Sequence, residues 1–241
     1  MCLRLKYEEA LQWKAHAAQL VADSRKKAAS IPCDPLFRTN PQLSSLVSEV
    51  DGIKKRHGLL LEKALIFAIG KLPGWKAGKE EISLAGGKAH LDCVAYNETT
   101  HQLYVFECKR GHGSFDADKM RAIDERLRRI SAAIGPHAAS KGWTPASSNT
   151  FILSFYGTSW KSSFPIFGAS SIGTLFGPCI GRFMFEYMHH VESYVARTVA
   201  SELGHSVDAP IVGSIFDEID DARPRPWPDV FFSETAASLH F

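Results

Sequence analysis

The sequence predicts an α/β fold in which helices flank a mixed central sheet, in the order helix, three strands, helix, strand. Three observations support this prediction. Residues 89–111 contain two apolar strands joined by a polar turn. Residues 116–134 have apolar side chains at helical spacing, with Gly135-Pro136 as the expected stop. Residues 150–156 form a continuous apolar run, which is typical of a buried strand.

Composition places the chain among ordinary soluble proteins. Its 241 residues are 45% hydrophobic and 22% charged, enough for one substantial core. The net charge is only +2, so any affinity for nucleic acid must come from a local basic face. No run approaches the roughly 18 apolar residues of a membrane helix. We therefore expect a cytoplasmic protein with no membrane partner.

The remaining elements are predicted from local patterns. Four further segments carry them: helices over residues 5–29, from Pro41 to Lys71 and from about Cys179 to Leu203, and a short strand over residues 79–85. We expect an N-terminal helix and linker (1–40), a core (41–157) and a helical extension with a proline-rich tail (158–241), packed as one domain. Five widely spaced cysteines without a Cys-x-x-Cys pattern indicate neither a zinc knuckle nor a disulfide framework.

The two strands of residues 89–111 carry the candidate chemistry. Antiparallel pairing around a four-residue loop, 98–101, places three pairs opposite one another: Tyr96 with Leu103, Val94 with Val105, and Asp92 with Glu107. Opposed residues lie roughly 5 Å apart at Cβ. Two carboxylates that close repel, so both stay ionised only with a cation between them. Lys109 projects from the same face as Glu107. The hairpin therefore predicts a metal-binding carboxylate pair beside an ammonium.

The pattern Asp–x14–Glu-x-Lys, formed by Asp92, Glu107 and Lys109, resembles that of the PD-(D/E)XK nuclease superfamily. Leu91 stands where that family often has a proline. The resemblance covers roughly residues 50–157. It implies a restriction-endonuclease-like αβββαβ core with a mixed sheet flanked by helices, to which this chain adds N- and C-terminal helices.

The resemblance also implies roles for individual residues. Asp92, Glu107 and the backbone carbonyl of Cys108 would hold Mg²⁺, for which Mn²⁺ would substitute. Lys109 would orient or deprotonate the attacking water, or stabilise the charge of the pentavalent phosphorane. Glu62 shares a helical face with Leu59, Ile66 and Ile69, where a carboxylate is costly without a partner. It would be a further catalytic carboxylate and metal ligand, or alternatively it caps a rim or pairs with a lysine.

The expected partner is DNA. Five residues around the hairpin are the predicted phosphate contacts: His57, Arg110, His112, Lys119 and Arg121. The other cations of helix 116–134 alternate with Asp and Glu, which is typical of a solvated face. Endonucleases of this fold are often dimers, so the resemblance also allows a homodimer.

The predicted function is therefore a Mg²⁺-dependent endonuclease that hydrolyses phosphodiester bonds in DNA, in restriction, defence or repair. Two alternatives stay open. The first alternative is an RNA-directed or structure-specific nuclease. The second is a non-catalytic nucleic-acid-binding subunit that keeps the fold. For Asp92, Glu107 and Lys109 themselves, the alternative is a surface salt bridge.

Overall fold

The computed structural model describes residues 3–111, 117–157, 161–202, 216 and 230–232. The chain divides into two compact units. Unit 1 comprises residues 1–3, 62–184 and 232–241, and unit 2 comprises residues 4–61 and 185–231. The predicted boundaries at residues 40 and 157 stay predictions.

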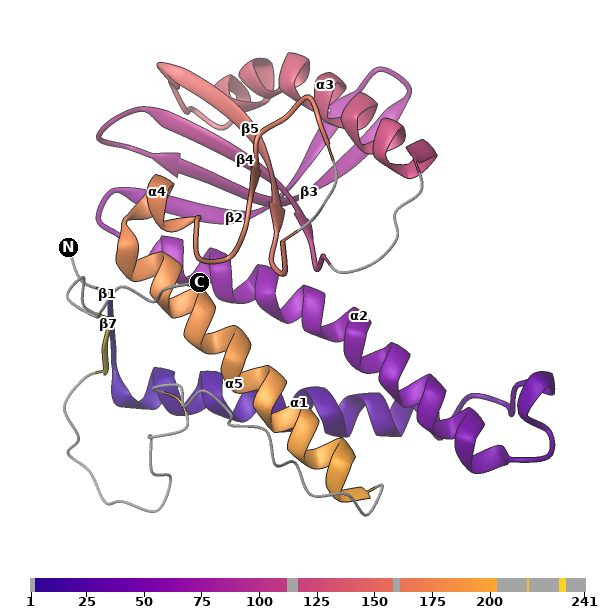
Figure 1. Ribbon diagram of the computed structural model, residues 1–241. Coiled ribbons are helices and arrows are strands. Elements are labelled where there is room, and N and C mark those ends of the chain that lie inside the picture. The colour runs from indigo at the N-terminus through magenta and orange to yellow at the C-terminus, as the bar shows by residue number, and fades with distance from the viewer. Residues whose placement is uncertain (1–2, 112–116, 158–160, 203–215, 217–229, 233–241) are drawn as a thin grey trace. The chain divides into compact units, whose positions relative to one another are not determined.

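Unit 1 is built on a five-stranded sheet of order β2-β3-β4-β5-β6 (Figure 1). The strands are β2 (Trp75–Leu84), β3 (Gly87–Asn97), β4 (Gln102–Lys109), β5 (Ser147–Ser154) and β6 (Ile166–Phe167). The first three run antiparallel, whereas β4, β5 and β6 are parallel. Helix α3 (Ala117–Ser140) provides the crossover that a parallel connection from β4 to β5 requires. With α2 (Pro41–Gly70) before the sheet, the predicted mixed α/β class and element order are confirmed.

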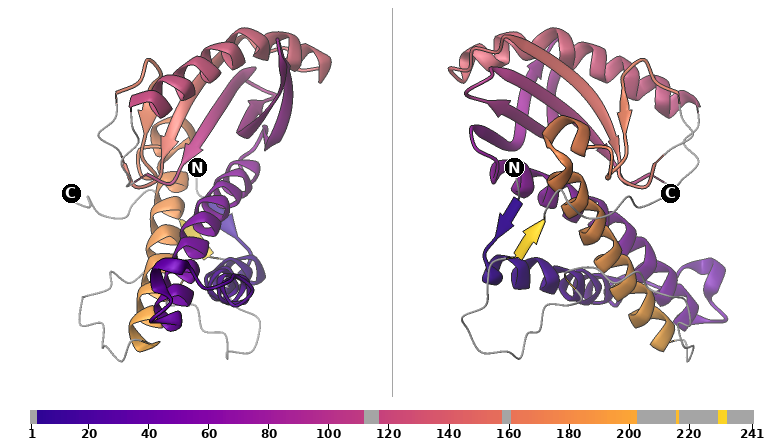
Figure 2. Two further views of the ribbon diagram at one scale, coloured as in Figure 1. Left: turned by 90° about the vertical axis from the view of Figure 1, so that its right-hand side faces the viewer. Right: turned by 60° about the vertical axis from the view of Figure 1, so that its left-hand side comes forward.

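The core of unit 1 has two faces because side chains alternate along each strand. Helix α3 lies along one face (Figure 2), where Leu127, Ile130 and Ile134 pack into a buried cluster with sheet residues that include Val94, Val105 and Ile152. The other face carries a chain of aromatic contacts. Its members are Trp75, Tyr104, Phe106, Phe151 and, from α4 (Gly173–Phe176), Phe176.

The hairpin between β3 and β4 has the predicted loop, since β3 ends at Asn97 and β4 begins at Gln102. Two predicted pairs, Tyr96 with Leu103 and Val94 with Val105, are confirmed. The turn forms because the Asn97 side-chain carbonyl accepts the backbone N–H groups of Thr99 and Thr100, both at 2.8 Å.

Two element boundaries differ from the prediction by four residues or more. Helix α3 continues past Gly135-Pro136 to Ser140, so the predicted end at Ile134 is wrong. Pro136 removes one hydrogen bond of the helix, but the fully buried Ala138 keeps the next turn packed on the core cluster. Strand β2 begins at Trp75, four residues early, because Trp75 pairs with Asn97 and its ring lies 5.4 Å from that of Tyr104.

Unit 2 contains α1 (Tyr7–Ala28), a short 3₁₀ turn (Pro35–Phe37), the first part of α2 and the larger part of α5 (Pro178–Glu202). Trp13 packs edge-on against Tyr187 with centroids 5.2 Å apart, and Arg25 pairs with Glu49 at 3.0 Å. Strands β1 (Leu3–Leu5) and β7 (Val230–Phe232) form a separate two-stranded sheet.

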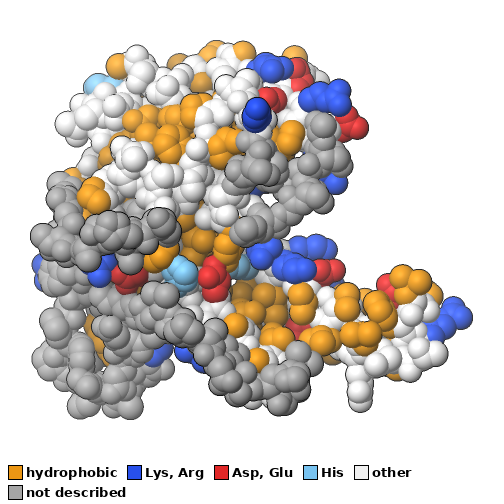
Figure 3. Space-filling view, viewed as in Figure 1, with side chains coloured by type: hydrophobic (Ala, Val, Ile, Leu, Met, Phe, Trp, Pro, Cys, Tyr) orange, Lys and Arg blue, Asp and Glu red, His pale blue; other side chains and the backbone are white. Residues whose placement is uncertain are grey.

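The surface of unit 2 is partly apolar. Figure 3 shows hydrophobic side chains gathered over the region where α2 begins, and Leu36 and Leu43 there are 85% and 40% exposed. Throughout the part of the chain that the structure describes, no helix is both long and apolar enough to cross a membrane. The predicted proline-rich segment, residues 223–228, lies outside the described residues.

Asp124 of α3 anchors the segment before β6. Its carboxylate accepts hydrogen bonds from the Ser162 hydroxyl at 2.5 Å and from the Ser163 N–H and hydroxyl, both at 3.0 Å. Burial works to raise the pKa of Asp124, but these bonds and the charge of Arg128 outweigh it, so the pKa is lowered. A lowered carboxyl pKa contributes stability above the ordinary value, and that contribution disappears as pH falls through the folded pKa.

We therefore expect Asp124→Asn to lower the melting temperature at pH 6, and the difference from the intact protein to shrink as the pH falls below about 3.8, the ordinary Asp value. The measurement is a series of thermal melts from pH 6 to pH 3. Asp118→Asn is the matched control, since Asp118 lies on the same helix but its side chain is 87% exposed. A pH-independent deficit for Asp124→Asn would contradict the role of its charge.

Candidate functional site

A bulge in β3 positions Asp92. On β2, Gly78 pairs with Val94 and Glu80 pairs with Leu91, so two steps along β2 span three along β3. The extra residue breaks the two-residue alternation. As a result Leu91 and Val94, three positions apart, pack into the same core cluster, and Asp92 lies between them.

Asp92 contacts β4 through its side chain. The Cα register of β3 and β4 runs only to Cys93 and Phe106, so the structure has no Asp92–Glu107 pair among the described register partners. Instead Asp92 Oδ2 accepts the backbone N–H of Cys108 at 2.8 Å. The register agrees with the prediction as far as it runs, and the direct opposition of Asp92 and Glu107 stays a prediction. The contact that the structure shows joins the Asp92 carboxylate to the residue after Glu107 on β4.

Glu107 is a buried carboxylate held by two cations. Its side chain is 3% exposed, and its Oε1 atom accepts from Lys109 Nζ at 2.5 Å and from Arg126 at 3.0 Å. Lys109 also donates to the Cys108 carbonyl at 3.2 Å, and Arg126 also donates to the His90 carbonyl. Burying this charge is costly in a low-dielectric interior. The Lys109 ammonium and the Arg126 guanidinium offset that cost.

Glu62 forms the second charged pair of the site. It is 9% exposed, and its Oε2 accepts from Lys79 Nζ of β2 at 2.5 Å. Burial raises the pKa of Glu62, and the charge of Asp92 raises it further, whereas Lys79 and Lys109 act to lower it. Burial acts to lower the pKa of Lys79, but its bond to Glu62 and the charges of Glu62 and Asp92 outweigh this, so the pKa is raised.

Glu62 therefore lies within electrostatic range of Asp92 and Lys109, and the prediction that it pairs with a lysine is also met. The predicted helical stripe is wrong at one end, because Leu59 is 51% exposed. We call the set Glu62, Lys79, Asp92, Glu107, Lys109 and Arg126 the charged cluster. All six belong to unit 1.

No family model, curated protein or solved structure matches this chain. The charged cluster must therefore be interpreted from its own chemistry. Its oxygen donors, three carboxylates and the Cys108 carbonyl, are the kind that Mg²⁺ prefers. Within the described residues, no group of three or more His, Cys, Asp or Glu is arranged to hold a metal ion. The donor set fits Mg²⁺ by its chemistry, and metal binding at the cluster is a proposal.

The thiols beside the cluster are not part of its chemistry. Cys93 and Cys108 are buried and free, as predicted. Burial raises the pKa of both thiols, and the neighbouring Asp92 and Glu62 carboxylates raise them further. Both cysteines therefore stay protonated, and only the backbone of Cys108 contributes to the site.

The predicted phosphate contacts have different surroundings. Arg110 lies with its guanidinium 5.2 Å from the centre of the Tyr156 ring. Lys119 and Arg121 are exposed near the start of α3, where Figure 3 shows side chains of both charges, and Arg121 pairs with Asp118 at 2.7 Å. His57 is buried and belongs to unit 2, and His112 lies outside the described residues. Their contacts with DNA stay predictions.

Gly111 fixes the path of the chain as it leaves the cluster. Its φ is +83°, and a Cβ there would lie 2.7 Å from both the Gly157 carbonyl and the Ser154 hydroxyl. No side chain fits in that space, so β4 can leave beside the end of β5 only through glycine.

Sequence analysis missed two members of the cluster. Lys79 was assigned only to the start of a strand, and Arg126 only to the solvated cations of α3. Arg126 does have a usable signal, because it lies three residues after Ile123 and directly before Leu127, on the flank of the core stripe. Lys79 has no comparable local signal.

Proposed function

We propose that this chain is a Mg²⁺-dependent endonuclease that hydrolyses phosphodiester bonds in DNA. The observation that supports the proposal best is the contact of Lys109 Nζ with Glu107 Oε1 at 2.5 Å. Beside it, the Asp92 carboxylate accepts a hydrogen bond from the backbone N–H of Cys108, the residue between Glu107 and Lys109. A carboxylate pair with an adjacent ammonium on neighbouring strands is the arrangement that the hairpin prediction requires. The αβββαβ order of elements supports a restriction-endonuclease-like framework for it.

The residues of the cluster divide into ligands and donors. Asp92, Glu107 and the Cys108 carbonyl would hold Mg²⁺, which when bound supplies positive charge to a phosphate oxygen. The Lys109 side chain is 22% exposed, so a water molecule or substrate can reach its ammonium. Lys109 would donate to the attacking water or to the charge that develops on the phosphorane.

Glu62 and Arg126 would also contribute to this site. Glu62 brings a third carboxylate whose pKa is raised by burial and by Asp92, so a nearby cation would be favoured there. Arg126 holds Glu107 in place through a bond at 3.0 Å. Because a double-strand cut needs two such sites, we also propose a homodimer. Restriction, defence and repair are the roles that suit this chemistry.

The test is incubation of the full chain with plasmid, linear duplex DNA, single-stranded DNA and RNA, each with Mg²⁺, Mn²⁺ or EDTA. We expect plasmid to be cut with either metal and to stay intact with EDTA. Cutting that continues in EDTA contradicts the mechanism. Cutting of RNA alone favours an RNA-directed nuclease, and DNA binding without any cutting favours a non-catalytic subunit.

A further inference from the structure

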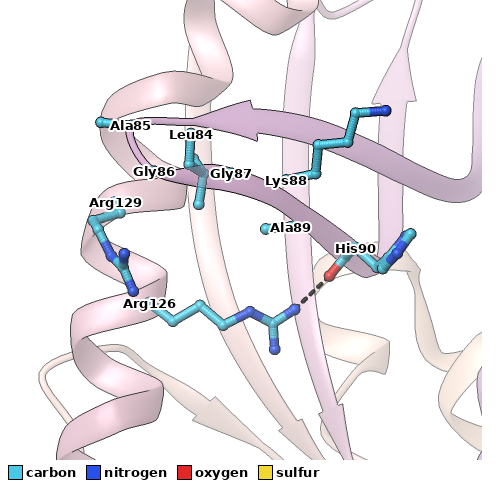
Figure 4. Close-up of a pocket in the computed structure, with 9 residues that line it drawn as sticks. All are labelled: Leu84, Ala85, Gly86, Gly87, Lys88, Ala89, His90, Arg126 and Arg129. Atoms are coloured by element: carbon cyan, nitrogen blue, oxygen red, sulfur yellow. Dashed lines mark hydrogen bonds between the residues drawn. The ribbon is translucent and has the colours of Figure 1, made fainter.

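A pocket of about 270 Å³ lies beside the turn between β2 and β3 (Figure 4). Residues 84–90 form one wall, and Arg126 and Arg129 of α3 form the other. Three cations therefore line it, Lys88, Arg126 and Arg129, together with His90. Among the nine described residues of this lining, none carries a carboxylate.

The cations of the pocket have acidic partners outside it. Lys88 pairs with Glu81 at 2.6 Å, whereas Arg129 reaches Glu125 only at 4.0 Å, with both side chains more than half exposed. An exposed ion pair at that distance contributes little. Of the three cations, Arg129 therefore loses the least interaction energy when its guanidinium turns toward an incoming anion.

The wall formed by residues 84–90 is open at the β2–β3 turn. Gly86 and Gly87 have φ values of +95° and +143°, and a Cβ built on either would meet nothing within 4 Å. No side chain covers the backbone at these two glycines, so an anion can approach it there.

Arg126 connects this pocket to the charged cluster. Its guanidinium lines the pocket and donates to the His90 carbonyl, as the dashed line of Figure 4 shows, while its other terminal nitrogen lies 3.0 Å from Glu107 Oε1. One side chain thus borders both the pocket and the carboxylate that the proposed function places at the reaction. A ligand in the pocket would be a near neighbour of that site.

We infer that the pocket binds a phosphate group of the DNA backbone, close to the bond that is cut, with Arg129 as its main contact. The inference rests on the proposed function for its choice of DNA. Arg suits this task, since its planar guanidinium donates two parallel hydrogen bonds to phosphate oxygens. The open glycine turn suits a ligand that is part of a longer chain and must enter and leave the pocket at both ends.

The experiment measures binding of the full chain to a fluorescent DNA duplex in EDTA, by anisotropy, over a range of salt concentrations. Loss of one phosphate contact lowers the slope of log Kd against log salt by about 0.9, which is roughly eightfold in Kd at 0.1 M salt. We expect this change for Arg129→Gln. Arg128→Gln is the matched control: Arg128 is 60% exposed, pairs with the same Glu125 at 3.5 Å and does not line the pocket. Its Kd should stay within about twofold.

Several results would overturn the inference. Equal Kd values for the Arg129→Gln and Arg128→Gln variants would show that Arg129 does not contact a phosphate of the DNA. The absence of DNA binding by the intact chain would show the same. Inorganic phosphate that raises the melting temperature of the intact chain but not that of the Arg129→Gln variant, with equal DNA Kd values for the two proteins, would assign the pocket to a free anion. An Arg129 effect on RNA but not on DNA would assign it to RNA. The proposed function fails separately. If the chain binds DNA through Arg129 but cuts nothing with Mg²⁺, the phosphate contact stands, whereas the nuclease activity and the position of the contact near a cut bond do not.

Discussion

Replacing Lys109 by alanine is expected to slow DNA cutting about a thousandfold while leaving the fold intact. The reason is the position of its ammonium, which contacts Glu107 Oε1 at 2.5 Å and the Cys108 carbonyl at 3.2 Å and is still 22% exposed. No other described cation of β4 has this placement, and Arg126 remains to pair with Glu107. The measurement is the single-turnover rate of plasmid cutting at saturating protein, since that rate reports the chemical step.

Lys76→Ala is the matched control for this prediction. Lys76 also forms a lysine–glutamate pair, with Glu98 at 2.5 Å, but its side chain is 59% exposed and it lies outside the charged cluster. Its cutting rate should be unchanged. Lys109→Arg separates two roles, since arginine keeps the charge but cannot accept a proton at neutral pH. If Lys109→Ala cuts within tenfold of the intact rate, Lys109 has no part in the reaction.

The elements of the fold were predictable where their signals are local. The 98–101 loop follows from Asn97, whose side chain makes the turn by itself, and the register follows from the apolar residues on both sides of it. The end of α3 was not predictable in the same way. Gly135-Pro136 is a strong local stop, and the helix continues past it because the next turn is packed on the core, where Ala138 is fully buried.

In the charged cluster, too, some features follow from local sequence signals and others depend on the tertiary fold. Glu107 and Lys109 could be paired from sequence because a strand places residues i and i+2 on one side. The bulge at Asp92 has no residue signature, so the sequence did not predict it, nor the hydrogen bond from the Cys108 N–H to the Asp92 side chain. Arg126 and Lys79 are 19 and 17 residues from their partners Glu107 and Glu62. Such contacts depend on the tertiary fold, and no periodicity within one element reveals them.

The double variant Lys109→Met/Arg126→Met is expected to lose roughly 3 kcal/mol of unfolding free energy. Methionine keeps most of the side-chain volume, so the change removes charge and not packing. Glu107 would then be a buried carboxyl group, 3% exposed, without the two cations that now bond to its Oε1 atom. This loss lies at the lower end of the range for broken buried ion pairs. The reason is that Lys109 and Arg126 are 22% and 33% exposed, so water can partly replace them.

Adding Glu107→Gln to the double variant should restore most of the lost stability, because the uncompensated charge is then gone. Urea unfolding of the three proteins at pH 7 measures both steps, and Lys76→Met provides the exposed-pair control, with an expected loss below about 1 kcal/mol. This rescue is the decisive observation. If the triple variant is no more stable than the double variant, the two cations stabilise unit 1 by their packing alone, and Glu107 is not held in place by charge. A rescued triple variant would instead show that Glu107 is held inside the protein by the charges of Lys109 and Arg126, which is the role that the structure gives them.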